Sequence, residues 1–446
     1  MPSPPEHTLF YTLTIQALLF TLAVVSIVLI YAWLVYRLGN SSLRHVPGPW
    51  RSIFATKPYE DHRIKRKYTS SFYQAKTIYK LPEIEEHVNS RSLAVLDQVR
   101  HGGDDVFSLT SRYALDNITF LVFGPNHGTH SVDQTCTERG ILEGLKHQQF
   151  IGPLRYRCPW LYNHASDLLQ RLSSRLRYLS ADEEFPAWCQ KKFFAALKGA
   201  PLNESHSLVR HLWELKEDGA HDGSIDVPYM AAETLDNIDA AEATIAVTAT
   251  YLICKLTEAP EWQRKIRQEL SALPKQDDGC LLFADIDTRV PSLEACLREV
   301  YRMHPSSSGK NERVVPLGGR TLAGVFVPEH TVVTSSVLAL HYDGEVYSDP
   351  DRFLPRRWID SSEEERKALD AQLIPFGYGG RTCLGKALAT MELKLLIAGL
   401  YLEYESMATS VTSAESMKQC STHDAVPRGL KCVVMFRRVK NNATPE

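Results

Sequence analysis

The chain has 446 residues, of which 44% are hydrophobic and 23% charged, and its formal net charge is −3 at pH 7. A chain of this length and composition can bury a large core, and its nearly balanced charge gives no basis for binding nucleic acid. Its nine cysteines include no Cys-x-x-Cys pair. This argues against zinc knuckles and thioredoxin-type sites and is typical of a reducing compartment.

The first predicted element is a membrane anchor. The run from Leu9 to Tyr36 contains no charged side chain, and a bilayer core requires only about 20 apolar residues as a helix. Arg37 and Arg44 follow the run, so the positive-inside rule places the rest of the chain in the cytosol. We therefore expect residues 1–40 to form a single-pass anchor.

A proline-rich hinge and a basic segment come next. Pro47 and Pro49 flank a glycine, and proline cannot continue a helix. We expect residues 41–60 to be a hinge, followed by one main domain over residues 61–446. The segment Asp61–Tyr68 reads as a basic helix. Taken alone, it is a solvated cationic face or a surface for an acidic redox partner.

The main domain is predicted to be mainly α with minor β. Apolar residues recur with a period close to 3.6 over residues 232–256 and 293–303, which indicates helices. The apolar run 386–400 is also helix-prone. Residues 313–340 are rich in β-branched residues interrupted by turn signals, which predicts short strands.

Two charged residues on the predicted helix over residues 293–303 form a Glu-x-x-Arg motif. Glu299 and Arg302 are three positions apart, so they share a face of the helix and can bond directly. The commoner fate of this pattern taken alone is a solvated ion pair.

A cysteine in a glycine-rich loop is the most informative feature. Cys383 directly precedes the helix-prone run, and the positive end of a helix favours a thiolate, the form that binds metal. The glycines allow the backbone to approach a flat, bulky group, and Arg381 can bind an anionic part of it. A planar, anionic group whose iron is held by one thiolate is haem. The alternative is a buried structural cysteine in a turn.

The sequence Phe-x-x-Gly-x-Arg-x-Cys-x-Gly is complete here, and it resembles the haem-binding loop of the cytochrome P-450 family of haem-thiolate monooxygenases. The residues that carry it are Phe376, Gly379, Arg381, Cys383 and Gly385. The resemblance implies a cytochrome P-450 fold preceded by one transmembrane helix. It also implies haem b with Cys383 as the axial ligand of the iron. The anchor, hinge and basic helix look like those of fungal microsomal members, many of which tailor secondary metabolites.

The resemblance also assigns structural roles. In the family, a Pro-x-Arg-aromatic loop sends its arginine to the Glu-x-x-Arg pair. Here the loop Phe353–Trp358 would bring Arg357 to Glu299 and Arg302, and the triad would support the core on the haem side.

Three further residues resemble family groups that bind haem propionates. Arg313 matches the arginine that follows the Glu-x-x-Arg helix. His62 and Arg66 match a Trp-x-x-x-Arg pair in which histidine replaces tryptophan.

The helix expected to serve oxygen activation departs from the family. Aligned on Thr244, the usual acid is Ala243 and the usual glycine is Ala241. The Thr244 hydroxyl would position a water or dioxygen, or else bond back to a helix carbonyl. Glu242 lies one residue early, about 100° round the helix from the usual acid. It would deliver protons through water, or be a surface or structural carboxylate.

A second departure concerns length. Only about ten residues separate Trp50 from Asp61, where family members usually place several helices and strands. We therefore also expect residues 41–60 to be a truncated junction. Either the chain is compact by design, or it lacks a segment.

The predicted function is insertion of one oxygen atom from O2 into a lipophilic substrate, with catalysis by Thr244 and Glu242. The resemblance implies that electrons come from NADPH through a separate NADPH-cytochrome P-450 reductase, and the chain itself has no Gly-x-Gly-x-x-Gly motif. The location would be the endoplasmic reticulum membrane, with the catalytic domain in the cytosol. The alternatives are a haem-binding but inactive member, a haem-thiolate isomerase or peroxide-using enzyme, and a membrane scaffold without a cofactor.

Overall fold

The computed structural model divides the chain into two units, Met1–His62 and Arg63–Glu446, and every residue described here belongs to the second. The described residues are 68–100, 104–148, 162, 179, 181–199, 206–219, 225–276, 279–309, 312–421 and 424–439. The expected anchor, hinge and truncated junction lie outside them, as do most of the basic helix, His62 and Arg66.

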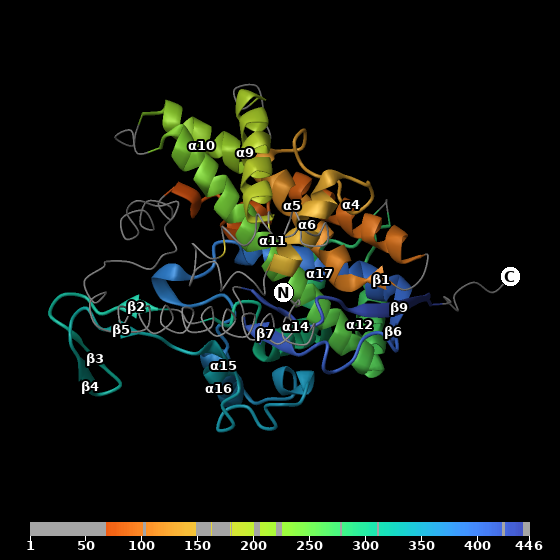
Figure 1. Ribbon diagram of the computed structural model, residues 1–446. Coiled ribbons are helices and arrows are strands. Elements are labelled where there is room, and N and C mark those ends of the chain that lie inside the picture. The colour runs from red at the N-terminus through yellow and green to blue at the C-terminus, as the bar shows by residue number, and fades with distance from the viewer. Residues whose placement is uncertain are drawn as a thin grey trace, which may run out of the picture. The chain divides into compact units, whose positions relative to one another are not determined.

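Helices dominate the described part of the chain, as predicted (Figure 1). They are α3 (Ala75–Ile78), α4 (Pro82–Val99), α5 (Val106–Phe123), α6 (Thr137–Gln148), α9 (Ala181–Gly199), α10 (Leu208–Glu217), α11 (Val227–Glu258), α12 (Pro260–Ser271), α13 (Phe283–Arg289), α14 (Pro291–Met303), α15 (Val337–His341), α16 (Glu363–Gln372) and α17 (Lys386–Glu403), with the 3-10 turns η4 (Pro355–Trp358) and η5 (Gly379–Arg381).

The strands are short and antiparallel. In chain order they are β1 (Asp104–Asp105), β2 (Arg313–Val314), β3 (Arg320–Leu322), β4 (Val325–Val327), β5 (Val332–Val333), β6 (Tyr404–Ala408), β7 (Gln419–Ser421), β8 (Ala425–Pro427) and β9 (Val433–Arg438). One three-stranded sheet has the order β1-β9-β6, and the other pairs are β2 with β5, β3 with β4, and β7 with β8. The expected fold class, mainly α with minor β, is therefore confirmed.

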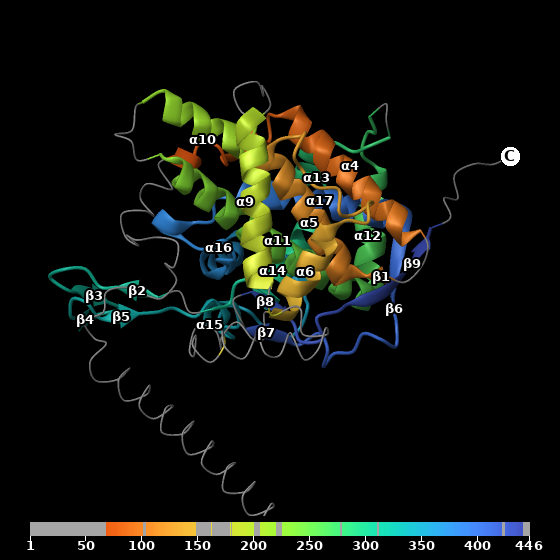
Figure 2. The same ribbon diagram turned by 45° about the horizontal axis from the view of Figure 1, so that its top comes forward.

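The core of the described part is built from α4, α5, α11 and α17, which pack against one another (Figure 2). Helix α11 begins at a capped end, where the Asp226 carboxylate accepts a hydrogen bond from the Tyr229 amide at 2.7 Å. On α5, Thr110 Oγ1 lies 3.0 Å from Thr250 Oγ1 of α11, and the Tyr113 hydroxyl donates to the Glu392 carbonyl of α17 at 2.9 Å. These bonds fix the orientation of α5 relative to α11 and α17.

Helices α11, α14 and α17 confirm the three predicted from apolar periodicity. The strand prediction over residues 313–340 is right only as far as Val333, because Val337–His341 forms α15. The Ser336 hydroxyl accepts from the Ala339 amide at 3.2 Å and begins this helix. The β-branched residues from which strands were predicted gave no indication of this N-cap.

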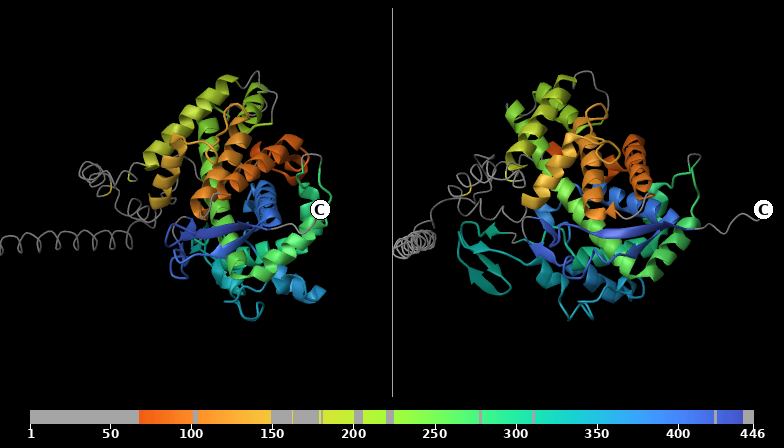
Figure 3. Two further views of the ribbon diagram at one scale, coloured as in Figure 1. Left: turned by 90° about the vertical axis from the view of Figure 1, so that its right-hand side faces the viewer. Right: turned by 45° about the vertical axis from the view of Figure 1, so that its right-hand side comes forward.

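The expected membrane anchor finds no counterpart in the described residues, where no helix is both long and apolar enough to cross a bilayer. The apolar run from Leu9 to Tyr36 lies outside them. Figure 3 shows the described helices from two further sides; the C-terminal strand β6 pairs with β9 and contacts α11.

Candidate functional site

The glycine-rich loop is a tight turn that leads directly into α17. Gly377 and Gly379 have φ angles of 71° and 68°, in the left-handed region that favours glycine. The Cys383 amide donates to the Phe376 carbonyl at 2.7 Å and closes the turn. The residues that the sequence pattern singled out are thus those that shape this loop.

Cys383 is the only exposed cysteine among the eight in the described residues. The alternative of a buried structural cysteine is therefore wrong. Gly385 caps the beginning of α17, and a Cβ added to it would lie 3.9 Å from the Cys383 sulfur. The unpaired amides and positive dipole end of an 18-residue helix are thus close to the sulfur, and they favour an anionic form.

Two tyrosines lie near this sulfur. Tyr301 of α14 packs edge-on against Phe376, with ring centroids 5.2 Å apart. Burial raises the pKa of Tyr301 and of Tyr73 well above the ordinary value, and the Cys383 sulfur contributes to both shifts. The pKa of Tyr73 is also raised by Glu233 of α11. The cysteine loop, α14 and the first half of α11 are therefore close together.

Two of the predicted haem-binding arginines are exposed and keep guanidinium nitrogens that bond to no described residue. Arg381, in η5, is exposed and has no hydrogen-bond or ion-pair partner among the described residues. Arg313, in β2, is exposed, and its side chain donates to the adjacent Glu312 carbonyl at 2.8 Å. Both side chains can therefore bind an anionic group.

The structure brings the three residues of the expected triad together. Arg302 donates to Glu299 through Nη2 at 2.8 Å and Nε at 3.1 Å, and Arg357 Nε donates to the same carboxylate at 3.2 Å. The side chains of Glu299 and Arg302 are fully buried. The alternative of a solvated ion pair is therefore wrong.

Backbone and aromatic donors complete the Glu299 site. Trp358 Nε1 donates to Glu299 Oε2 at 2.9 Å, and the Leu354 amide donates to Oε1 at 3.1 Å. On the other side, Arg302 Nη1 donates to the His341 and Pro350 carbonyls at 3.0 and 2.8 Å. Backbone groups of His341, Pro350 and Leu354 are thus bonded to the triad.

His341 was not predicted as a site residue, yet it links the triad to the cysteine loop. Burial and the nearby Arg302 guanidinium lower its pKa to about 4, so the ring is neutral at pH 7. Nδ1 lies 3.1 Å from the Arg302 carbonyl, and Nε2 accepts from the Ile374 amide at 3.0 Å. Ile374 begins the turn that leads to Cys383, because its carbonyl accepts from the Gly377 amide at 3.0 Å.

On α11, the Thr244 hydroxyl bonds to its own helix. Its Oγ1 donates to the Ala240 carbonyl at 2.8 Å. This is the back-bonding arrangement that helix threonines often adopt. The hydroxyl must leave this carbonyl before it can donate to a water or a ligand.

Glu242 faces α5. It lies one helical turn before Ala246, whose carbonyl is 3.2 Å from Thr110 Oγ1 of α5. Burial of the carboxyl group raises the pKa of Glu242 to about 8, the Ser111 hydroxyl partly offsets the shift through a hydrogen bond, and nearby Asp424 adds to it. The shift favours the protonated form of Glu242 at neutral pH. Glu242 lies about 200° round the helix from Thr244.

Comparison with known proteins identifies the family. The Cytochrome P-450 family model matches residues 35–421. The chain belongs to the cytochrome P-450 family. Cytochrome P-450 monooxygenase FGM1 of Gibberella zeae is 33% identical over 398 residues, covering 87% of this chain and 77% of the relative. A cytochrome P-450 monooxygenase of Aspergillus terreus is 35% identical over 380 residues, covering 80% and 73%. This P-450 is therefore an oxidoreductase of the monooxygenase class.

Membership implies a haem cofactor, and the residues of the loop fit one. Among the described residues, no group of three or more His, Cys, Asp or Glu side chains is arranged to hold a metal ion. Haem iron needs only one protein ligand, and Cys383 offers one exposed sulfur. The Arg381 guanidinium, which bonds to no residue in the described ranges, suits the carboxylates of the porphyrin.

Proposed function

We propose that this P-450 inserts one atom of O2 into a lipophilic organic substrate, with haem b bound through Cys383. The observation that supports this most is the exposed sulfur in a glycine-shaped turn at the beginning of α17. Haem supplies, when bound, the O2 chemistry that side chains lack, and the protein binds, orients and shields it.

The side chains around the loop have separate tasks in this proposal. Cys383 binds the iron, while Phe376, Gly379 and Gly385 shape the turn. Positive groups bind the haem propionates; they are Arg381, Arg313, Arg66 and His62. The Glu299, Arg302 and Arg357 triad, together with His341, holds the backbone that precedes the turn.

Protons reach the reaction through α11. Thr244 leaves the Ala240 carbonyl and orients a water at the oxygen-binding side. Glu242 holds a proton at neutral pH. It takes the place of the acidic residue that the family usually has at the position of Ala243. The carboxyl and the hydroxyl lie on different faces of the helix, so water must connect them.

The fungal relatives and the apolar N-terminal run support a proposed substrate class and proposed partners. The matched monooxygenases are fungal, and one of them, cytochrome P-450 monooxygenase mpaDE of Penicillium brevicompactum, is 26% identical over 387 residues, covering 80% of this chain and 42% of the relative. We assign a secondary-metabolite intermediate as the substrate. Electrons come from NADPH through a reductase in the endoplasmic reticulum membrane, where Leu9–Tyr36 anchors the chain. Removing residues 1–40 should shift the protein from the microsomal to the soluble fraction.

The first test is the carbon monoxide difference spectrum of the dithionite-reduced, membrane-expressed protein. We expect the band that names the family in the native chain and its loss in Cys383→Ser, because serine provides no thiolate. Cys420→Ser, at a partly buried cysteine outside the loop, is the control and should keep the band. An unchanged band in Cys383→Ser contradicts the ligand assignment. Incorporation of isotopically labelled O2 into product, with NADPH and reductase, then tests oxygen insertion directly.

A further inference from the structure

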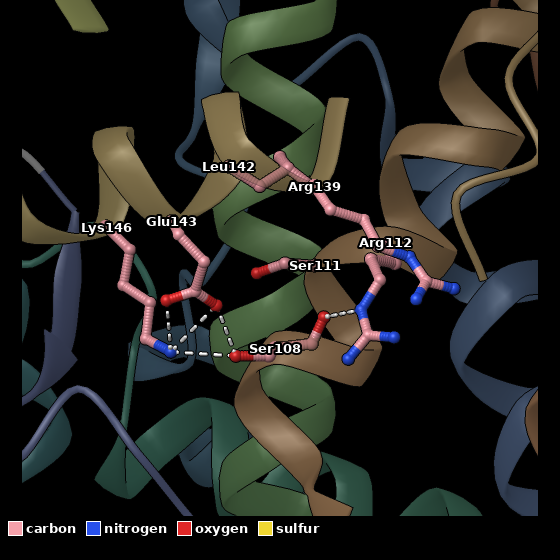
Figure 4. A pocket seen from close by; sticks show the side chains of 7 residues that line it. All are labelled: Ser108, Ser111, Arg112, Arg139, Leu142, Glu143 and Lys146. Atoms are coloured by element: carbon pink, nitrogen blue, oxygen red, sulfur yellow. Dashed lines mark hydrogen bonds and ion pairs between the residues drawn. The ribbon is translucent and has the colours of Figure 1, made fainter. Parts of the chain in front are cut away.

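A polar pocket of about 180 Å³ lies between α5 and α6, and no residue of the cysteine loop or the triad lines it (Figure 4). Liquid water occupies ~30 Å³ per molecule, so the pocket has room for one small oxyanion and a few waters. The lining carries more positive than negative charge. Its polar residues are Ser108, Ser111, Arg112, Arg139, Glu143 and Lys146.

The lysine of this pocket is already paired with carboxylates. Lys146 Nζ lies 3.1 Å from Asp105 Oδ2 and 3.4 Å from Glu143 Oε1. It also donates to Ser108 Oγ at 2.8 Å. The excess positive charge of the lining therefore comes from its two arginines.

Arg139, in the first turn of α6, is held in place by backbone carbonyls. Its Nε donates to the Ser131 carbonyl and its Nη2 to the Val132 carbonyl, both at 2.7 Å. Neither acceptor carries a formal charge, and no carboxylate in the described ranges pairs with this guanidinium. The side chain is thus a partly buried cation with a fixed orientation. Such a cation is stabilised by a ligand that supplies the missing negative charge.

The loop that holds Arg139 also contacts Arg112 of α5. Ser131 Oγ donates to the Arg112 carbonyl at 3.2 Å. The same serine is fixed by the buried Asp116 carboxylate, which accepts from the Ser131 amide at 2.7 Å and from its hydroxyl at 2.8 Å. Printed contacts therefore run from Arg139 of α6 through one anchored residue to Arg112 of α5.

The two guanidinium groups lie at one end of the pocket. Figure 4 shows the side chains of Arg112 and Arg139 at this end and those of Glu143 and Lys146 at the other. Arg112 Nε donates to the Ser108 carbonyl at 3.1 Å, so neutral groups orient this arginine as well. Two cations kept on the same side of a pocket repel each other, and an anion between them removes that repulsion. Guanidinium groups bind phosphate oxygens through paired N–H donors.

We propose that this pocket binds a phosphate group between Arg112 of α5 and Arg139 of α6. The arginines come from different helices, which suits a tetrahedral ion with oxygens on every side better than a planar carboxylate. The phosphate belongs to a small soluble phosphate monoester, to inorganic phosphate, or to a lipid headgroup. Once bound, it joins the first turn of α6 to α5, the helix that packs against α11. The site is separate from the cysteine loop and does not depend on oxygen insertion.

Phosphorus-31 NMR tests the site without turnover. The resonance of inorganic phosphate should broaden when the detergent-solubilised full chain is added. Arg112→Gln and Arg139→Gln should each weaken binding roughly tenfold or more, because each removes a charge-assisted donor. Arg100→Gln, at an exposed arginine that pairs with Asp97 at 3.2 Å, is the matched control and should bind phosphate as the native chain does. Equal broadening in the native chain and both pocket variants overturns the proposal.

Arg112→Gln keeps the test decisive if Arg139→Gln fails to fold. The Arg139 side chain holds the loop at Ser131 and Val132, whereas Arg112→Gln leaves those two hydrogen bonds intact. Circular dichroism of each variant shows whether it is folded. A folded Arg112→Gln that binds phosphate as tightly as the native chain contradicts the site.

Hydrogen exchange locates the site and identifies the source of the phosphate. Phosphate should slow exchange of the amides of α6 more than those of α12, because it joins α6 to α5. Glycerol 3-phosphate should give the same protection if the ligand is soluble. Nanodiscs of phosphatidylcholine with phosphatidate, compared with phosphatidylcholine alone, should give it if the ligand is a headgroup. Protection by none of these probes, or equal protection by chloride at the same ionic strength, overturns the proposal.

Discussion

Two glutamates, the fully buried Glu299 on α14 and the partly buried Glu242 on α11, have opposite surroundings. The Glu299 carboxylate accepts hydrogen bonds from two arginines, an indole and a backbone amide. Burial raises the pKa of Glu242, the nearby carboxylates of Asp424 and Asp239 add to the shift, and Ser111 offsets only part of it. Donors that match a buried charge make it a fixed structural element. A buried carboxyl with few donors instead keeps a proton that it can release.

A third glutamate extends this comparison. Glu392 on α17 is buried, and its Oε1 has no hydrogen-bond partner in the described part of the chain. Burial raises the pKa of Glu392 well above its usual range. The stabilisation of the carboxylate by neighbouring groups therefore decreases from Glu299 on α14 to Glu242 on α11 and then to Glu392 on α17.

The largest expected effect comes from removing the compensated charge. Glu299→Ala leaves the guanidinium groups of Arg302 and Arg357 buried without their carboxylate, which should cost ~3–5 kcal/mol of unfolding free energy. We expect mostly haem-free, poorly folded protein, measured by urea unfolding and haem content. Lys367→Ala, in an exposed pair with Glu363, should change stability by less than ~1 kcal/mol. Normal haem content in Glu299→Ala would contradict the role of the triad in supporting the core on the haem side.

A smaller loss should follow from cutting the link between triad and loop. His341→Phe leaves the Ile374 amide and the Arg302 carbonyl unpaired, at a cost of ~1–3 kcal/mol. The carbon monoxide band should also weaken or shift, because Ile374 begins the turn that carries Cys383. His330→Phe, at an exposed histidine, is the control. Equal effects of the two substitutions would show that His341 does not position the loop.

The pH dependence of stability should test the protonation of Glu242. The pKa of Glu242 is raised from 4.5 to about 8, so the folded protein retains a proton that the unfolded chain has released. The free energy of unfolding should therefore fall as pH rises from 4.5 toward 8, and level off above it. Glu242→Gln removes this dependence, so the variant should gain stability relative to the native chain as pH increases. Parallel urea-midpoint curves for the two proteins would contradict the assignment.

The smallest effect on stability is expected on the opposite face of α11. Thr244→Ala removes one hydroxyl that bonds back to Ala240, and alanine is the better helix former, so stability should change by less than ~1 kcal/mol. Product formed per NADPH should nevertheless fall if the hydroxyl orients water. Thr234→Ala removes a similar back-bond to Met230 and serves as the control. Unchanged coupling would show that protons travel without Thr244.

The amino-acid sequence determined the local features of this protein. Positive-φ glycines, the beginning of α17 and the i,i+3 spacing of Glu299 and Arg302 depend on neighbours within a few residues. The family motif therefore located the cysteine turn, and apolar periodicity located α11 and α14. The end of the strand region was misplaced because a serine cap, and not β-branched composition, decided where α15 begins.

Tertiary structure alone decided which distant groups meet. His341 carries no motif, since its partners are backbone atoms of Arg302 and Ile374. Spacing along α11 put Glu242 out of line with the usual acid, yet only the packing of α5 against α11 placed Ser111 near it. The physical reason is that burial and donor number are set by neighbouring elements, so residues of one type acquire different protonation behaviour at different positions in one fold.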